Sequence, residues 1–336
     1  MSEVLFPVLW AIGLLVFVGI LAGRARILLA ARPSARFDRI PERLRRALVY
    51  GLGQKKFFAG EQPAGIMHAL VFWGFVVLII QVIILFGRTF DASWDIPGFG
   101  PDQPLGPPFL ILRDLVEAVV IVGVSYMLWR RVVLHTPRLF GIGGAEQRFR
   151  DAPHWEGVLI LVFILLIMVG GLLYDAGRLV EYDIHGNERN FAPVTALVAA
   201  GLGGLSRSSA HTISEAGWWL HCVTILVFLC LLPLSKHFHI ITSLPNVFFQ
   251  PLVVKGKLPD VEDIEGKLER EEPIGVAKIE HLDQKQILDL YTCTECGRCS
   301  DNCPAHKTGK MLSPKMLTLN LRDHLYGRDD ELIEKS

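Results

Sequence analysis

The chain lacks the arrangements on which most soluble enzymes depend. Its 336 residues contain no glycine-rich phosphate loop, no pairing of a nucleophile with a base and no basic patch for nucleic acid. The formal charges balance at zero. No internal repeat and no pair of Gly/Pro-broken apolar segments is present, which argues against a secondary transporter. Two features remain, which are a cluster of cysteines and long apolar runs.

Cysteine is scarce, and four of the six residues fall in one run. Cys293, Cys296 and Cys299 are followed by Cys303 and then Pro304, which is the ligand spacing of a bacterial-type [4Fe–4S] cluster. In two-cluster ferredoxins the fourth cysteine ligates the other cluster, and this chain has no second run. We therefore expect the first three thiolates to need a further ligand, and Cys303 to serve a cluster whose other ligands lie elsewhere.

Two other readings of the cysteine run are weaker. A zinc site usually separates two cysteine pairs by a longer loop. Disulfides are disfavoured because the topology below places the run in a reducing compartment. The remaining pair, Cys222 and Cys230, lies inside an apolar segment and is expected to be buried.

Long apolar runs indicate an all-α membrane protein. Hydrophobic residues make up 51% of the chain, and residues after about 250 are charged and ordinary in composition. A membrane-spanning helix needs about 20 apolar residues. Five segments satisfy this by inspection, near Leu5–Gly23, Ile66–Phe86, Phe109–Trp129, Val158–Tyr174 and Trp218–Leu234.

The distribution of basic residues predicts the orientation. The leader Met1–Glu3 has no positive charge, so the first span is not expected to be a cleaved signal peptide. Arginine and lysine crowd the loops at 24–56 and 130–150, whereas 91–108 has almost none. The positive-inside rule then places the N-terminus outside and the cysteine run in the cytoplasm of a bacterial inner membrane.

The sequence also predicts the structure of several segments between the spans. The basic stretch 39–58 reads either as an amphipathic helix on lipid or as a solvated loop. The apolar stretch 194–205 is too short to span and reads as interfacial or re-entrant. We assign 1–245 to a transmembrane domain, 246–282 to a linker and 283–336 to a partial ferredoxin-like module.

Capping signals predict two helices in the last module. Asp283 can cap a helix over 284–291 that ends at the cysteine loop. Ser313 followed by Pro314 opens a second helix that runs to about Tyr326. A stretch this short buries little core alone, which favours a missing partner.

Histidines at membrane depth are candidates for function. His68 lies at the cytoplasmic start of the second span, and His237 and His239 lie at the end of the fifth. Two imidazoles from facing helices form a haem b site, and we expect His68 and His239 to be the ligands. His237 is the alternative to His239, because Pro233 can kink the helix.

His221 is separated from His239 by 18 residues, which is five turns of a regular helix, so the two would share a face about 27 Å apart. The second span offers Leu78 and Gln81, and no histidine, at the height of His221. His221 therefore either ligates an outer haem, with His185 or His211 as possible partners, or lines a quinone site in the outer leaflet.

With five spans and these histidines, the membrane part resembles the gamma subunit of respiratory nitrate reductase, which implies b-type haem and quinone chemistry. That family places two haem histidines on the second span, and only His68 is present here. This departure puts the outer haem in doubt.

The whole chain is more similar to the membrane-bound iron–sulfur proteins related to heterodisulfide reductase. The resemblance rests on Met67–Leu70, Trp218–His221, Pro233–Ile240, Cys293–Pro304, Leu312–Lys315 and Leu321–Leu325. Some members connect electron-transfer flavoprotein to menaquinone. The family's second cysteine motif and its CCG modules are absent here, which suggests a truncated or split form.

The resulting hypothesis is a quinone-linked oxidoreductase subunit of the inner membrane. It passes electrons between a cytoplasmic iron–sulfur or flavoprotein donor and menaquinone or ubiquinone, through a [4Fe–4S] cluster and haem b. The resemblance implies a CCG-type subunit and electron-transfer flavoprotein as partners, and nothing implies nucleic acid. The alternative is a non-haem membrane anchor that docks an iron–sulfur partner.

Overall fold

The computed structural model describes residues 2–336 except 35, 92, 137–138, 140–151, 254–262, 273, 329–332 and 334–336. Three of the predicted loop arginines, Arg138, Arg148 and Arg150, lie outside the described residues, as does the middle of the predicted linker. Within the described residues the chain is helical, and its β-structure is one isolated bridge between Arg32 and Asp283. The all-α prediction is confirmed for this part of the chain.

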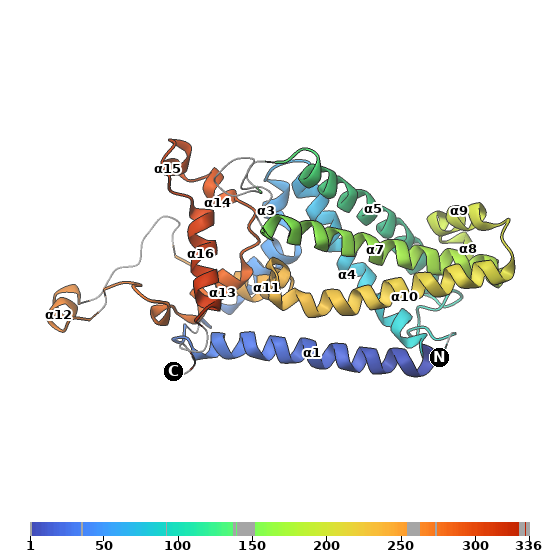
Figure 1. The fold of residues 1–336 in the computed structure, drawn as a ribbon, viewed down its shortest axis with the longest axis horizontal. Coiled ribbons are helices and arrows are strands. Elements are labelled where there is room, and N and C mark those ends of the chain that lie inside the picture. Colours follow the sequence, from blue (N-terminus) through green and yellow to red (C-terminus); the bar gives the residue numbers. More distant parts are fainter. Residues whose placement is uncertain are drawn as a thin grey trace. The chain divides into compact units, whose positions relative to one another are not determined.

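The helices of four or more residues, labelled as in Figure 1, are α1 Ser2–Ala30, α2 Ile40–Arg46, the π-helix η1 Ala47–Leu52, α3 Lys55–Phe58, α4 Ala64–Gly87, α5 Gly106–Val132, α7 Ala152–Glu181, α8 Asn187–Asn190, α9 Pro193–Leu202, α10 Arg207–Leu231, α11 His239–Phe248, α12 Ile264–Glu269, α13 Gln284–Thr292, α14 Arg298–Asp301, α15 Pro304–Lys307 and α16 Pro314–Tyr326.

The chain packs into two compact units, which we name by what they contain. The bundle unit comprises Met1–Val16, Lys56–Thr136 and Arg150–Leu231, and holds α4, α5, α7 and α10. The cluster unit comprises Phe17–Lys55, Pro137–Phe149 and Leu232–Ser336, and holds the cysteine run. Our domain boundaries at 245 and 282 follow sequence composition and stay a prediction.

Within the bundle unit, α7 and α10 lie side by side along most of their length (Figure 1). Glycine permits this close approach. A Cβ on Gly217 of α10 would lie 2.6 Å from the backbone nitrogen of Tyr174, and one on Gly177 of α7 would lie 2.8 Å from that of Ser214. Small residues at such crossings let helix backbones pack in the way common in membranes.

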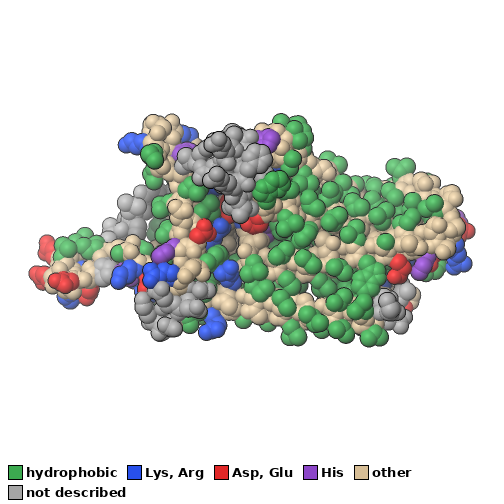
Figure 2. All heavy atoms as spheres, viewed as in Figure 1, with side chains coloured by type: hydrophobic (Ala, Val, Ile, Leu, Met, Phe, Trp, Pro, Cys, Tyr) green, Lys and Arg blue, Asp and Glu red, His purple; other side chains and the backbone are tan. Residues whose placement is uncertain are grey.

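The bundle unit turns many apolar side chains outward. Val4, Leu15 and Val122 are 75, 73 and 63% exposed. Figure 2 shows hydrophobic side chains gathered over the long helices, whereas charged side chains gather over α12. Four helical stretches are long and apolar enough to cross a membrane, namely Val4–Ala30, Ala64–Gly87, Trp155–Glu181 and Arg207–Leu234.

Four of the five predicted spans are thus supported. The remaining one, Phe109–Trp129, does form a helix, α5, of 27 residues. However, α5 does not belong to the four apolar stretches, because it carries Arg113, Asp114 and Glu117 in its first half and Arg130 and Arg131 at its end. The five-span arrangement therefore stays a proposal.

The buried charges of α5 tie it to its neighbours. Arg113 forms an ion pair with Asp175 of α7 at 3.1 Å. Asp114 accepts hydrogen bonds from the backbone nitrogens of Val194 and Thr195 at 2.6 and 2.9 Å, and so caps the start of α9. The stretch predicted as interfacial or re-entrant is this short helix, which packs on α7.

The cluster unit has a conventional buried core. Ile27 of α1, Ala31 just after it, Phe238, and Ile287 and Tyr291 of α13 are buried together. The two predicted capping signals are confirmed: Asp283 and Gln286 form a reciprocal capping box at the start of α13, and the Ser313 side chain accepts from Met316 nitrogen at the start of α16.

The basic stretch 39–58 forms α2, η1 and α3, and Arg43 is 2% exposed. Its guanidinium donates to the carbonyls of Phe248 and Gln250 at 3.0 and 2.8 Å and pairs with the Asp38 carboxylate at 2.6 Å. Arg43 therefore satisfies carbonyls at the end of α11, as basic side chains often do at helix C-termini. The solvated-loop reading is wrong for this residue.

Candidate functional site

The cysteine run lies on an irregular loop between α13 and α14. Cys293 follows the last residue of α13, Cys299 lies in α14, and Cys303 precedes α15. Glu295 and Gly297 both have positive φ, 57° and 76°, so the chain turns sharply between the first three cysteines. Such a loop can present several thiolates to one face.

The thiols fit an iron–sulfur cluster by chemistry and spacing. Cys293, Cys296 and Cys303 are half-buried and Cys299 is exposed. Burial raises the pKa of the Cys293 thiol above its usual value. Among the residues that the structure describes, no three His, Cys, Asp or Glu side chains converge at a metal-binding distance. The assignment of Cys293, Cys296, Cys299 and Cys303 as ligands therefore stays a prediction.

Buried ion pairs between charged side chains hold this loop in place. Glu295, between the first two cysteines, is 5% exposed. Its two carboxylate oxygens pair with Lys236 Nζ at 3.1 Å and with the Arg322 guanidinium at 2.7 Å. Burial alone would raise the pKa of Glu295, but the two cations outweigh burial and hold that pKa below its usual value. Glu295 is therefore charged at neutral pH and fixed in place.

Lys236 also joins this loop to the histidine segment. Its carbonyl oxygen lies 2.9 Å from Nδ1 of His239, which donates to it. The neutral ring then carries its lone pair on Nε2, which is the arrangement of a metal-ligating histidine. One residue thus contacts both the cysteine loop, through its side chain, and His239, through its backbone.

The prediction that His221 and His239 share one face of a regular helix is wrong. Helix α10 ends at Leu231, and two short 3-10 turns, Leu232–Leu234 and Lys236–Phe238, precede α11. Pro233 lies in the first turn, and it cannot donate a helical hydrogen bond. The 18-residue phase and the 27 Å rise therefore do not apply. The rings of His237 and His239 lie 5.8 Å apart, so helical phase does not choose between them.

His221 lies in the interior of the bundle unit, 3% exposed. Its Nδ1 donates to the carbonyl of Ile167 on α7 at 2.8 Å. Its Nε2 is buried without a hydrogen-bond partner. A fixed Nδ1–H and an unsatisfied Nε2 are what a histidine ligand shows, because the backbone bond orients the ring and leaves the other nitrogen for the metal. The residue therefore fits haem iron.

His68 lies in the second turn of α4 and is half-buried. Its ring stacks on Phe57, with the ring centroids 4.0 Å apart and the planes at 3°. His68 belongs to the bundle unit and His239 to the cluster unit. Their pairing on one iron stays a prediction.

The two suggested partners of His221 have other contacts. His185 is exposed and pairs with Asp183 at 3.2 Å, and His211 pairs with Glu181 at 2.9 Å. Each imidazole therefore already contacts a carboxylate.

Sequence reasoning missed the charged residues beside these histidines. It assigned no role to Lys236, Glu295, Arg113 or Glu117, which are 7, 5, 5 and 5% exposed. A usable signal was present, because a charged side chain inside an apolar helix or between ligand cysteines is costly to bury and needs a partner.

Comparison with known proteins gives relatives along the whole chain. It is 33% identical over 340 aligned residues to "Probable iron-sulfur-binding oxidoreductase FadF" of Bacillus subtilis (strain 168), which covers 100% of this chain and 44% of that protein. It is 28% identical over 318 residues to "EtfAB:quinone oxidoreductase" of Syntrophomonas wolfei subsp. wolfei, covering 91% and 41%. The chain is thus related to proteins named as oxidoreductases.

A third relative matches a shorter part. A "Probable membrane-anchored ferredoxin" of Chromohalobacter salexigens is 36% identical over 58 residues, which are 17% of this chain and 9% of that protein. The chain spans less than half the length of the two relatives that it matches along most of its length. No family model matches, and no solved structure matches.

Proposed function

We propose that the chain is a membrane-bound electron-transfer subunit that passes electrons between a cytoplasmic donor and the quinone pool. A [4Fe–4S] cluster would be held by Cys293, Cys296 and Cys299, with Cys303 serving a second cluster. Haem b would be held by His68 and His239, and a second haem by His221. These groups would supply one-electron chemistry, for which the protein provides ligands, burial and distance.

The observation that carries the proposal is the double role of Lys236. Its side chain pairs with Glu295 inside the cysteine run, and its backbone oxygen orients His239. The predicted cluster loop and one predicted haem ligand are thereby joined through a single residue in the cluster unit. A docking anchor without redox groups has no need of this link.

The related proteins support the chemistry and the partners. One relative is named as a probable iron–sulfur-binding oxidoreductase and another as an EtfAB:quinone oxidoreductase. By analogy, electron-transfer flavoprotein is the proposed donor and a quinone the proposed acceptor. The apolar helices and the basic loops support an inner-membrane location with the cysteine run in the cytoplasm.

The test is a reduced-minus-oxidised absorption spectrum of the full chain, purified anaerobically with its companion proteins. We expect a b-type haem band after dithionite and iron–sulfur signals by electron paramagnetic resonance. Folded protein without the haem band would support the anchor instead.

Two histidine variants refine this test. His68→Ala should lose haem, whereas His135→Ala, at a histidine of the same unit to which no haem role is assigned, should keep the wild-type content. Full haem content in His68→Ala would overturn the ligand assignment.

A further inference from the structure

Helix α16 holds an arginine against the cysteine run. At the start of the helix, Ser313 Oγ lies 3.2 Å from Oγ of Ser300 in the run. Further along the helix, Arg322 Nη2 donates to Glu295 Oε1 at 2.7 Å. Because Ser300 and Glu295 both belong to the cysteine run, α16 contacts the run at two points.

Arg322 and Glu295 form an ion pair that water hardly reaches. Their side chains are 13 and 4% exposed. Glu295 also pairs with Lys236, whose side chain is 7% exposed. A second carboxylate near Arg322, that of Asp323, lies 3.6 Å from Nε and is 69% exposed, so water screens its charge. Buried charges are screened less than exposed ones, and they therefore act more strongly on their surroundings.

The pair lies beside the first predicted cluster ligands. Glu295 is two residues from Cys293 and next to Cys296. Burial raises the pKa of the Cys293 thiol, while the backbone of Glu295 and the charge of Arg322 both oppose that rise. Arg322 is therefore close enough for its charge to act on the Cys293 sulfur.

We propose that this ion pair sets the reduction potential of the predicted [4Fe–4S] cluster, with Arg322 raising the potential and Glu295 lowering it. One-electron reduction adds a negative charge to the cluster, so a nearby cation favours the reduced state and a nearby anion favours the oxidised state. Both are positioning residues, since neither supplies a sulfur ligand. The proposal rests on the proposed function, because it needs a cluster at the cysteine run.

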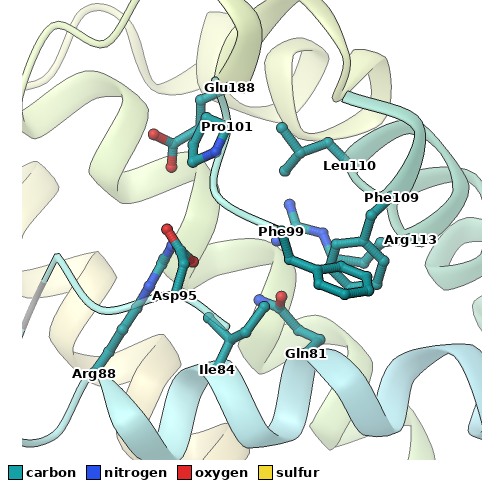
Figure 3. A pocket seen from close by; sticks show the side chains of 10 residues that line it. All are labelled: Gln81, Ile84, Arg88, Asp95, Phe99, Pro101, Phe109, Leu110, Arg113 and Glu188. Carbon is teal, nitrogen blue, oxygen red and sulfur yellow. The ribbon is translucent and has the colours of Figure 1, made fainter. Parts of the chain in front are cut away.

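The bundle unit provides a reference for the loss of a buried arginine alone. There Arg88 pairs with Asp95 at 2.8 Å, and the two side chains lie together in Figure 3. They are 8 and 16% exposed, which is similar to the burial of Arg322. The cysteine run belongs to the cluster unit, so this reference pair lies in the unit without predicted cluster ligands.

The test is a redox titration of the full chain with its companion proteins, purified anaerobically and reduced stepwise with dithionite. Electron paramagnetic resonance follows the iron–sulfur signal and gives its midpoint potential. Arg322→Gln should move the midpoint to a more negative value, and Glu295→Gln should move it to a more positive value. Arg322→Lys, which keeps the cation, and Arg88→Gln should both stay close to wild type.

The opposite signs distinguish an electrostatic role from a structural one. A loosened loop would admit water to the cluster in both variants, so shifts of the same sign in Arg322→Gln and Glu295→Gln would overturn the proposal. Unchanged midpoints would overturn it too. If both variants lost their iron under anaerobic conditions, the pair would be a structural support only, which again contradicts the proposal. An absent iron–sulfur signal in the wild type would instead overturn the proposed function.

Discussion

The two units neutralise their buried charges differently. In the cluster unit, both oxygens of Glu295 accept from cations, Lys236 and Arg322. In the bundle unit, Arg113 pairs with Asp175 yet keeps a buried Nε without a partner, as do Gln81 Nε2 and His221 Nε2. The cluster unit thus uses its charges to fix a loop. The bundle unit leaves these three nitrogens without a hydrogen-bond partner in its interior.

Apolar side chains also go to different places. Both units bury apolar side chains, such as Ile287 in the cluster unit and Leu85 in the bundle unit at 0% exposure, but the bundle unit also exposes them along its long apolar helices, as at Leu15 and Val122, which are more than 60% exposed. Water drives the first arrangement, and lipid permits the second. A substitution should therefore affect mainly the unit in which it lies.

The largest effect is expected from Cys296→Ser. Because serine oxygen is a poor iron–sulfur ligand, the iron–sulfur signal should disappear, while the haem band remains because no proposed haem ligand is changed. Cys230→Ser is the matched control, since Cys230 Sγ donates to Gly13 carbonyl oxygen at 3.3 Å and serine keeps a donor. Electron paramagnetic resonance and absorption on the same samples would decide. An intact iron–sulfur signal in Cys296→Ser would contradict the assignment.

The next-largest effect is expected from Glu295→Gln, which should destabilise the cluster unit. Removing one partner of a buried pair costs about 3–5 kcal/mol, and glutamine retains part of the hydrogen bonding, so the lower end is expected. Thermal unfolding and the rate of iron loss in air should both change. Glu265→Gln, on exposed α12, should change neither. Equal iron loss in the two variants would mean that the network does not support the loop.

Gly217→Ala should loosen the bundle unit by about 1–3 kcal/mol, because the new Cβ lies 2.6 Å from Tyr174 nitrogen. Gly201→Ala in α9 is the control, since its Cβ meets nothing within 4 Å. Unfolding in detergent, followed by helical circular dichroism, measures both. If Gly217→Ala proved as stable as Gly201→Ala, α7 and α10 would be able to accommodate the added methyl group without loss of stability.

Ser313→Ala should have the smallest effect, about 1 kcal/mol, through loss of the cap on α16. Ser313→Thr should recover most of it. Since neither substitution changes a proposed haem ligand, the haem band should stay unchanged in both. A haem loss in Ser313→Ala would show that the cap also supports the haem site.

The sequence predicted those structural features correctly whose determining residues lie close together in the chain. Asp283 and Ser313 are caps whose partners lie three residues away, so spacing alone predicts them. Long apolar helices follow from hydropathy in the same way. The break after Leu231 was harder, because one proline permits either a kinked or an interrupted helix.

The missed residues depend on contacts between distant parts of the chain. Lys236 and Glu295 are 59 positions apart, and no local pattern links them. Arg113 was hidden because apolar neighbours dominate the character of the third predicted span, although its partner, Asp175, comes from α7. Such pairing becomes visible only when the helices are packed.

The most direct test of the central claim is a single-turnover experiment. The purified chain with its companions, reduced anaerobically, is mixed with menadione while the b-type haem band is followed. The account predicts that the band returns to its oxidised position. A haem band that stays reduced in the presence of excess quinone would contradict electron transfer to the quinone pool.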